Sequence, residues 1–162
     1  MNTENAFVET IKENEALIYK VTAVYGNDSE DRKDLYQEIV LQLWKAFEKF
    51  KNQSQISTWL YRVALNTAIS RLRKTKKEGQ MVSFDAGLHV LEDSYDPVLE
   101  QRSKDLYQHI SMLNDIEKAV ILLFLEDKSH QEIAQITGLT VSNVGTRMGR
   151  IKEKLKKGIA KV

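Results

Sequence analysis

Residues 129–155 read SHQEIAQITGLTVSNVGTRMGRIKEKL, and their pattern predicts two helices joined by a tight turn. Ser129, followed three residues later by Glu132, forms a capping box, a pair typical of the start of a helix. Gly138 is expected to end that helix, and Thr140 to cap a second one. The segment therefore has the order of a helix-turn-helix, a motif whose second helix enters the major groove of DNA.

The second helix of this segment is predicted to have two different faces. The inward face takes apolar side chains from the whole motif: Ile133, Ala134, Leu139, Val144, Met148 and Ile151. On the opposite face we expect polar and cationic side chains: Ser142, Asn143, Thr146, Arg147, Arg150 and Lys154. Amide, hydroxyl and guanidinium groups can read base edges, while lysines position the helix on phosphates. A plain three-helix bundle with a basic surface is the alternative.

The composition favours a helical protein of moderate size. The chain has 162 residues, 42% of them hydrophobic and 29% charged, which suits one medium domain or two small ones. One proline and seven glycines favour helices throughout. The absence of cysteine excludes disulfides and thiolate metal sites. The polar N-terminus is unlike a signal peptide, and no apolar run approaches the ~18 residues needed to span a bilayer, so we expect a cytoplasmic protein without membrane insertion.

The formal net charge of +1 conceals a strong charge pattern. Residues 51–78 and 128–162 are basic, and residues 79–106 between them are acidic. Two basic blocks on patterned helices predict two contact surfaces for a polyanion such as DNA. Solvated helix faces are the alternative interpretation.

The first half of the chain predicts three helices. Residues 4–24 carry apolar side chains near helical spacing, and the segment ends at Gly26 with three candidate caps: Asn27, Asp28 and Ser29. Residues 34–50 form a second helix with more apolar surface than one core face requires. Ser57 or Thr58 is expected to cap a third helix, which reaches a cluster of cations.

This third helix lies within ISTWLYRVALNTAISRLRKTKK (56–77) and combines aromatic, amide and cationic groups. One face can follow a phosphate backbone and carries Arg62, Asn66, Arg73 and Lys77, extended by Arg71, Lys74 and Lys76. Aromatic side chains near its start could stack on unpaired bases, at ~1–3 kcal/mol per base: Phe50, Trp59 and Tyr61. Core packing is the alternative for each aromatic residue, and Trp59 in particular is expected to be partly core.

Beyond this helix the periodicity fails and then returns. Residues 79–96 have no clean period, and we interpret them as a linker. A helix is predicted from Pro97 to about residue 113, and Asn114 with Glu117 resembles a capping box that starts another. The helix-turn-helix follows.

Three stretches in this order resemble the extracytoplasmic-function sigma factors of bacterial RNA polymerase: DLYQEIVLQLWKAF (34–47), STWLYRVALNTAISRLRK (57–74) and the helix-turn-helix. The resemblance covers nearly the whole chain apart from the linker. It implies an all-α fold of two small helical domains joined by a flexible linker: sigma region 2 at 1–78, the linker at 79–97 and sigma region 4 at 98–162. It also implies a transcription initiation factor that binds core RNA polymerase, directs it to promoters and promotes opening of the minus-ten duplex.

The resemblance assigns roles to matching residues. The residues that would contact polymerase are Asp34, Gln37, Glu38, Leu41 and Trp44. Those that would bind the minus-ten element, where a flipped-out base is captured, are Phe50, Asn52, Ser54, Trp59, Arg62, Asn66 and Arg73. The outward face of the helix-turn-helix would read the minus-thirty-five element, with Thr146, Arg147 and Arg150 at the contact positions of the family.

Two glycines depart from the pattern of the family. Gly145 stands where a basic residue is common, and Gly149 where an aromatic residue or histidine often sits. Each costs roughly 1 kcal/mol of helix stability relative to alanine. Gly145 also removes one contact to DNA, although glycine could instead allow a close approach of the backbone.

The resemblance implies as partners promoter DNA and core RNA polymerase, through its clamp helices and flap, with an anti-sigma factor as a further candidate. It implies no cofactor and no metal. An independent helix-turn-helix repressor or activator is the alternative, but it would normally need a dimer seam, which the sequence does not show. An enzyme is the weakest candidate, because no phosphate-binding glycine loop or nucleophile–base pair is present and the histidines lack metal-ligand spacing: His89, His109 and His130. We therefore expect no catalytic site.

Overall fold

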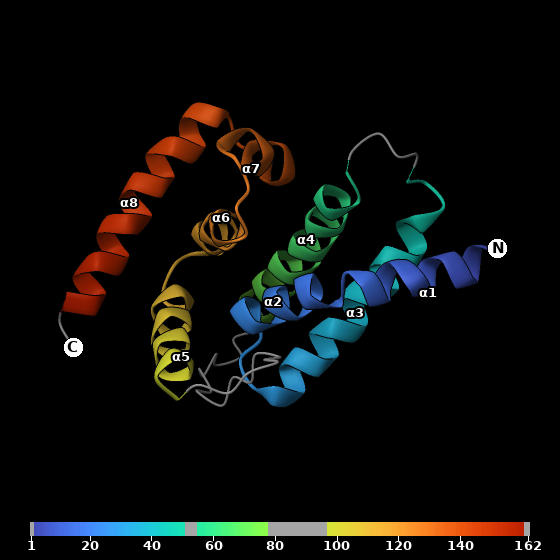
Figure 1. The fold of residues 1–162 in the computed structure, drawn as a ribbon, viewed down its shortest axis with the longest axis horizontal. Helices are drawn as coiled ribbons and strands as arrows, with labels where there is room; N and C mark the ends of the chain where they lie inside the picture. The colour runs from blue at the N-terminus through green and yellow to red at the C-terminus, as the bar shows by residue number, and fades with distance from the viewer. Residues whose placement is uncertain (1, 51–54, 78–96, 161–162) are drawn as a thin grey trace. The chain divides into compact units, whose positions relative to one another are not determined.

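The computed structural model describes residues 2–50, 55–77 and 97–160. Within these ranges every regular element is a helix, so the all-α prediction is confirmed. The chain divides into two compact units, Met1–Val90 and Leu91–Val162, and Figure 1 shows the helices of each unit. The predicted linker, residues 79–97, lies outside the described residues except for Pro97, which begins a helix.

The first unit is a helical bundle with its own core. Its helices are α1 (Thr3–Glu13), α2 (Glu15–Tyr25), α3 (Ser29–Phe47) and α4 (Ile56–Lys77). Helices α2, α3 and α4 pack against one another, and α1 packs on α3 (Figure 1). The core between them is filled by aliphatic side chains: Ile18, Val21, Leu35, Ile39, Leu43, Leu60, Ala64 and Leu65.

Helices α1 and α2 correct the prediction of one continuous helix over residues 4–24. Asn14 separates them, with a backbone φ of −119°. Its Nδ2 donates a hydrogen bond to the carbonyl oxygen of Thr10 at 2.8 Å, and its backbone N–H donates to Ile11 at 3.2 Å. Asn14 falls where the apolar repeat would place a core side chain, and these local bonds compete with the helix.

Helix α3 begins at Ser29 rather than at the predicted Asp34, because Asp28 caps it: the Asp28 carboxylate accepts from a backbone N–H of the first turn at 2.7 Å. The helix ends at Phe47 rather than Phe50.

Helix α4 also differs from its predicted start. It begins at Ile56, so Ser57 and Thr58 lie in the first turn instead of capping it. Thr58 is buried there.

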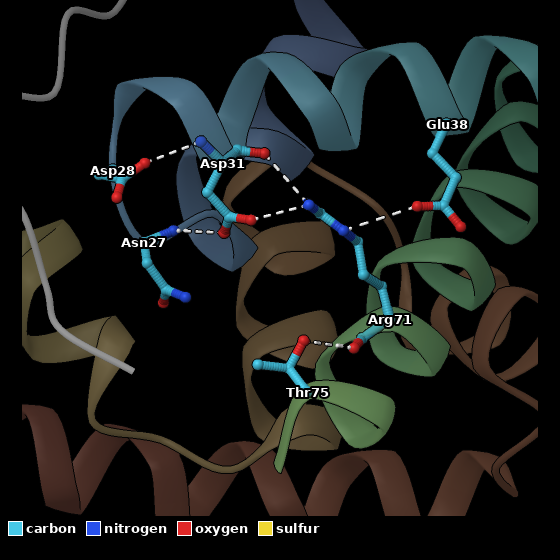
Figure 2. Close-up of polar contacts among 6 residues, drawn as sticks. All are labelled: Asn27, Asp28, Asp31, Glu38, Arg71 and Thr75. Atoms are coloured by element: carbon cyan, nitrogen blue, oxygen red, sulfur yellow. Dashed lines mark hydrogen bonds and ion pairs between the residues drawn. The ribbon is translucent and has the colours of Figure 1, made fainter. Parts of the chain in front are cut away.

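Arg71 joins the second half of α4 to the start of α3 (Figure 2). Its Nη2 lies 2.9 Å from Oδ1 of Asp31, and its Nη1 donates to the Asp31 carbonyl oxygen at 3.0 Å. Its Nε lies 3.5 Å from Oε2 of Glu38. From the sequence, Arg71 was expected to be one of the cations that follow a phosphate backbone. In the structure its guanidinium instead links α4 to α3 through Asp31 and Glu38.

The second unit is built from α5 (Pro97–Ser111), α6 (Asp115–Leu125), α7 (His130–Thr137) and α8 (Val141–Ala160). Helices α6, α7 and α8 pack against one another, and α5 packs on α6 and α8 (Figure 1). The core of this unit contains Ile110, Val120, Leu122, Leu123, Ile133, Val144, Met148 and Ile151.

The helix ends predicted for this unit are confirmed. Both capping boxes are present, one between Asn114 and Glu117 and one between Ser129 and Glu132. Gly138 adopts a left-handed φ of 82°, which ends α7. The hydroxyl of Thr140 accepts from the backbone N–H three residues later at 3.0 Å, which caps α8. The helix-turn-helix therefore has the predicted local geometry.

Candidate nucleic-acid and polymerase interfaces

Helix α8 carries a polar face, but that face is rotated relative to the prediction. Val144, Met148 and Ile151 are buried, as expected. Asn143 and Arg147 are half-buried and lie on the flank of the helix rather than opposite its core side. The side chains most distant from the core by helical spacing are exposed: Ser142, Thr146, Gly149, Arg150 and Glu153. The outermost face of α8 therefore carries mainly small side chains in its first half. Arg150 is the one cationic residue in this set, and Glu153 is the one acidic residue.

The flank of α8 is held by hydrogen bonds. Nε of Arg147 donates to Oδ1 of Asn143 at 3.1 Å, one helical turn away. Nζ of Lys154 lies 2.7 Å and 3.0 Å from the two carboxylate oxygens of Glu117 in α6. Lys154 was predicted to hold a phosphate; in the free protein its ammonium is paired with Glu117, while its side chain remains 57% exposed.

Glu117 is a buried carboxylate, with only 6% of its side chain exposed. Burial raises its pKa, but hydrogen bonds from Lys154 and from the Asn114 backbone, with the charges of Lys154 and Arg147, outweigh burial and lower its pKa overall. Glu117 is therefore an anion on α6 that holds the side chain of Lys154 on one flank of α8. The sequence identified Glu117 only as a cap, since its partner lies 37 positions away.

Two aromatic rings form a stacked pair at the start of α4. The rings of Phe50 and Trp59 have centroids 4.8 Å apart and planes 27° apart. Phe50 is half-buried, whereas Trp59 is only 9% exposed and also contacts Phe47 at 6.2 Å. The structure thus makes Phe50 the outer ring and Trp59 its support. Tyr61 is 2% exposed, so the prediction that it could stack on bases is wrong, because it belongs to the core.

Three more residues of the predicted minus-ten surface lie along one side of α4. Asn66 and Arg73 are exposed and Arg62 is half-buried, and their spacing places them on the face that begins at Trp59. Two further predicted residues, Asn52 and Ser54, lie outside the described residues.

The solvent side of α3 carries the predicted polymerase contacts. All five are exposed: Asp34, Gln37, Glu38, Leu41 and Trp44. Leu41 is 49% exposed and Trp44 42%, which confirms that α3 has more apolar surface than its core face needs. Exposed apolar side chains of this size, surrounded by polar ones, are typical of a protein interface.

A row of aromatic contacts connects this surface to the stacked pair. The ring of Trp44 meets Phe7 of α1 edge-on at 5.0 Å, and Phe7 meets Phe47 at 5.2 Å. Phe47 in turn contacts Trp59, which supports Phe50. In the sequence Phe7 is one of the apolar side chains near helical spacing within residues 4–24, and nothing local indicates that α1 packs against the end of α3.

In the ranges that the structure describes, no helix is long and apolar enough to cross a membrane. Among the same residues there is no cluster of three or more histidine or acidic side chains arranged to hold a metal ion.

Comparison with protein families yields two matches in chain order. Residues 10–78 match sigma-70 region 2, and residues 103–155 match sigma-70 region 4. These two segments correspond to the first and second structural units.

Individual relatives agree with these matches. The chain is 27% identical over 155 residues to RNA polymerase sigma factor SigV of Bacillus subtilis, covering 91% of this chain and 87% of that protein. It is 30% identical over 142 residues to the ECF RNA polymerase sigma-E factor of Haemophilus influenzae, covering 80% and 75%. The fold resembles that of the sigma factor RpoE from Bartonella quintana, solved in complex with the anti-sigma factor NepR, with a TM-score of 0.78, 18% identity and coverage of 96% and 97%.

Proposed function

Because the chain belongs to the sigma-70 family and directs RNA polymerase to promoters, we propose that its two units divide this task between duplex recognition and strand opening. The second unit reads the minus-thirty-five element through the N-terminal half of α8. The first unit binds polymerase through α3 and traps a minus-ten base beside α4. The stacked pair of Phe50 and Trp59 is the observation that carries the assignment of strand opening.

The aromatic pair suits base capture because its two rings have different environments. Trp59 is buried, so its position is held by the core, while Phe50 keeps part of its ring accessible. A base flipped out of the duplex loses stacking worth a few kcal/mol. Stacking on an aromatic side chain returns about 1–3 kcal/mol per base. A preformed aromatic surface at the start of α4, on the same helix face as the exposed Asn66 and Arg73, therefore supports trapping of a melted strand.

The solvent face of α3 is proposed to dock on the clamp helices of core polymerase. Leu41 and Trp44 supply apolar anchors, and the acidic and amide side chains around them supply polar contacts. The flap is the proposed polymerase contact of the second unit. In this mechanism the protein acts in the cytoplasm through binding alone and has no catalytic site of its own.

An anti-sigma factor is proposed as a regulator that covers one of these surfaces. Two observations support this proposal: the exposed apolar residues of α3, and the similarity of the fold to a sigma factor whose structure contains an anti-sigma factor. The alternative of an independent repressor has no role for a region 2 unit, which this chain contains.

The strand-opening role is tested by changing Phe50 to alanine. Holoenzyme carrying Phe50→Ala is expected to form closed complexes normally and to open linear duplex poorly, because the captured base loses its stacking partner. A template already mismatched across the minus-ten region should recover much of the activity. Permanganate reactivity of thymines and the yield of abortive transcripts provide the measurement.

Leu125→Ala serves as the control in this experiment, since it truncates a solvent-accessible apolar side chain in the second unit. Equal defects of Phe50→Ala on duplex and mismatched templates would show that Phe50 is a packing residue. Failure of the wild-type protein to co-purify with core polymerase would contradict the proposed function as a whole.

A further inference from the structure

We propose that Asn143 is a positioning residue, which presets the guanidinium of Arg147 for one base pair of the minus-thirty-five element and does not itself read a base. The inference rests on the proposed function of α8 as the reader of that element. The sequence assigned both Asn143 and Arg147 to the DNA-binding face, and this proposal gives the two residues different roles.

The hydrogen bond between the two residues defines the geometry. Nε of Arg147 donates to Oδ1 of Asn143 at 3.1 Å, and both side chains are half-buried on the flank of α8. This bond uses only the Nε–H of the guanidinium. Its two terminal nitrogens keep their hydrogens for other acceptors, and a bidentate contact from such a fork to O6 and N7 of guanine is the commonest specific contact in the major groove.

The same bond argues against base reading by Asn143. An asparagine recognises adenine when its Oδ1 and Nδ2 face the base edge together. In the structure Oδ1 of Asn143 faces Arg147 instead, which fixes the amide plane against its own helix. The side chain is therefore oriented for its neighbour along the helix.

The surroundings of Arg147 favour the same arrangement. The buried carboxylate of Glu117 lies near enough for Arg147 to stabilise its charge, and Glu117 also holds Lys154 on the same flank. Arg147 is thus held by a hydrogen bond to the amide of Asn143 and is attracted by the negative charge of Glu117. A long side chain that is ordered before binding loses less conformational entropy when it meets the base, so preorganisation should contribute to selectivity.

The test uses reconstituted holoenzyme and a promoter library randomised across the minus-thirty-five element, with base preference at each position as the readout. Arg147→Ala should reduce preference at one position by about tenfold or more. Asn143→Ala should reduce preference at that same position, and the double variant should lose no more than Arg147→Ala alone. Such non-additivity is the signature of two residues that act as one.

Asn143→Asp separates positioning from reading. It keeps the oxygen acceptor for Nε of Arg147 but cannot donate to a base. We expect it to retain the preference of the wild-type protein at that position, while its negative charge weakens binding to all sequences alike. Met112→Ala, a change at an 85% exposed residue outside α8, is the surface control and should leave all preferences unchanged.

Three outcomes would overturn the inference. The first is loss of preference at two different positions by Asn143→Ala and Arg147→Ala, with additive effects. The second is loss of preference in Asn143→Asp equal to that in Asn143→Ala. The third is an intact preference at every position in Arg147→Ala. A wild-type holoenzyme without any preference upstream would instead contradict the proposed role of α8 itself.

Discussion

Gly145 and Gly149, two of the three glycines of α8, stand at positions where packing in the free protein does not require glycine. A Cβ on Gly149 would meet no atom within 4 Å, and one on Gly145 would make only ordinary contact with the ring of His130 at 3.8 Å. Both positions could hold alanine within the fold. The two residues therefore weaken the helix without a steric reason inside the protein, and the space they leave is on or beside the proposed DNA-binding face.

Gly149→Ala is accordingly expected to raise the free energy of unfolding of the second unit by about 1 kcal/mol, because alanine loses less backbone entropy in a helix. Urea unfolding followed by circular dichroism measures the change. Gly138→Ala is the matched control and should destabilise the protein, since Gly138 has a φ of 82°. If Gly149→Ala is more stable but binds promoter DNA more weakly, close approach of DNA to the backbone explains why glycine stands at this position. If Gly149→Ala is less stable than wild type, the prediction is wrong.

Glu117 predicts a pH dependence of stability for the second unit. The pKa of this group is lowered in the folded protein from the ordinary value of 4.5, burial being outweighed by its hydrogen bonds and neighbouring cations. Below pH 4.5 the unfolded chain binds the proton first, so the stabilising contribution is present above that pH and is lost as pH falls through the lowered folded value.

The measurement is the free energy of unfolding of wild type and Glu117→Gln between neutral pH and pH 3. Glu117→Gln should be less stable than wild type at neutral pH, and the difference should shrink as the solution becomes acidic. Asp127→Asn, at an exposed acidic residue in the turn after α6, is the control. Parallel curves for wild type and Glu117→Gln would show that the ion pair with Lys154 does not stabilise the fold.

At the scale of the elements, α3 serves two purposes at once. One side packs into the core through Leu35, Ile39 and Leu43. The other side exposes the apolar residues proposed to meet polymerase. Arg71 holds the first half of this helix against α4, and Phe7 of α1 packs against its second half. The outer face of α3 is thus presented on a helix fixed from both sides.

Leu41→Ala tests the outer face of α3 most cleanly. Leu41 is 49% exposed, so truncation should change the free energy of unfolding little, yet an interface anchor of this kind costs more than about 1 kcal/mol of binding. Affinity for core polymerase, measured by fluorescence anisotropy, should therefore fall about fivefold or more. Val8→Ala, at a 43% exposed position of α1, is the control and should leave affinity unchanged.

Trp44→Ala is expected to be less informative, because Trp44 also packs against Phe7 at 5.0 Å and its loss should reduce stability as well as binding. Full polymerase affinity of the Leu41→Ala variant would exclude this face as the docking surface.

At the scale of the whole molecule, each unit encloses a core of its own. In the first unit the core is formed by α2, α3 and α4, and in the second by α6, α7 and α8. Within each unit, these helices pack against one another around their own apolar side chains. We therefore expect fragments 1–78 and 97–162 to fold separately.

Thermal unfolding of both fragments, followed by circular dichroism at 222 nm, tests this expectation. Each should be helical and unfold cooperatively, although domains of this size bury a smaller share of their surface than larger ones and have modest stability. A fragment that is unfolded alone but folds when the other is added would show that the two cores depend on each other.

The sequence alone determined the parts of this protein that depend on near neighbours in the chain. The caps at Asn114, Ser129 and Thr140 and the turn at Gly138 were predicted correctly, because each is made within a few residues. The helical class and the apolar stripes followed from periodicity, and the order of the motifs identified the sigma-factor family. The break at Asn14 was missed, since local hydrogen bonds there compete with the helix. The ends of α3 were also missed, and its start is set by the cap at Asp28.

Only the tertiary structure decided which of the predicted side chains are available to a partner. Arg71 and Lys154 appeared in the sequence as cations for phosphate, but they pair with acidic residues 40 and 37 positions away. Trp59 was expected to be partly core, and the structure confirms this, but only the tertiary structure shows that the buried Trp59 ring stacks on Phe50, which stays half-buried. Periodicity places a residue on a face of its own helix, whereas the charge or ring that meets it comes from another helix, and that encounter exists only once the chain has folded.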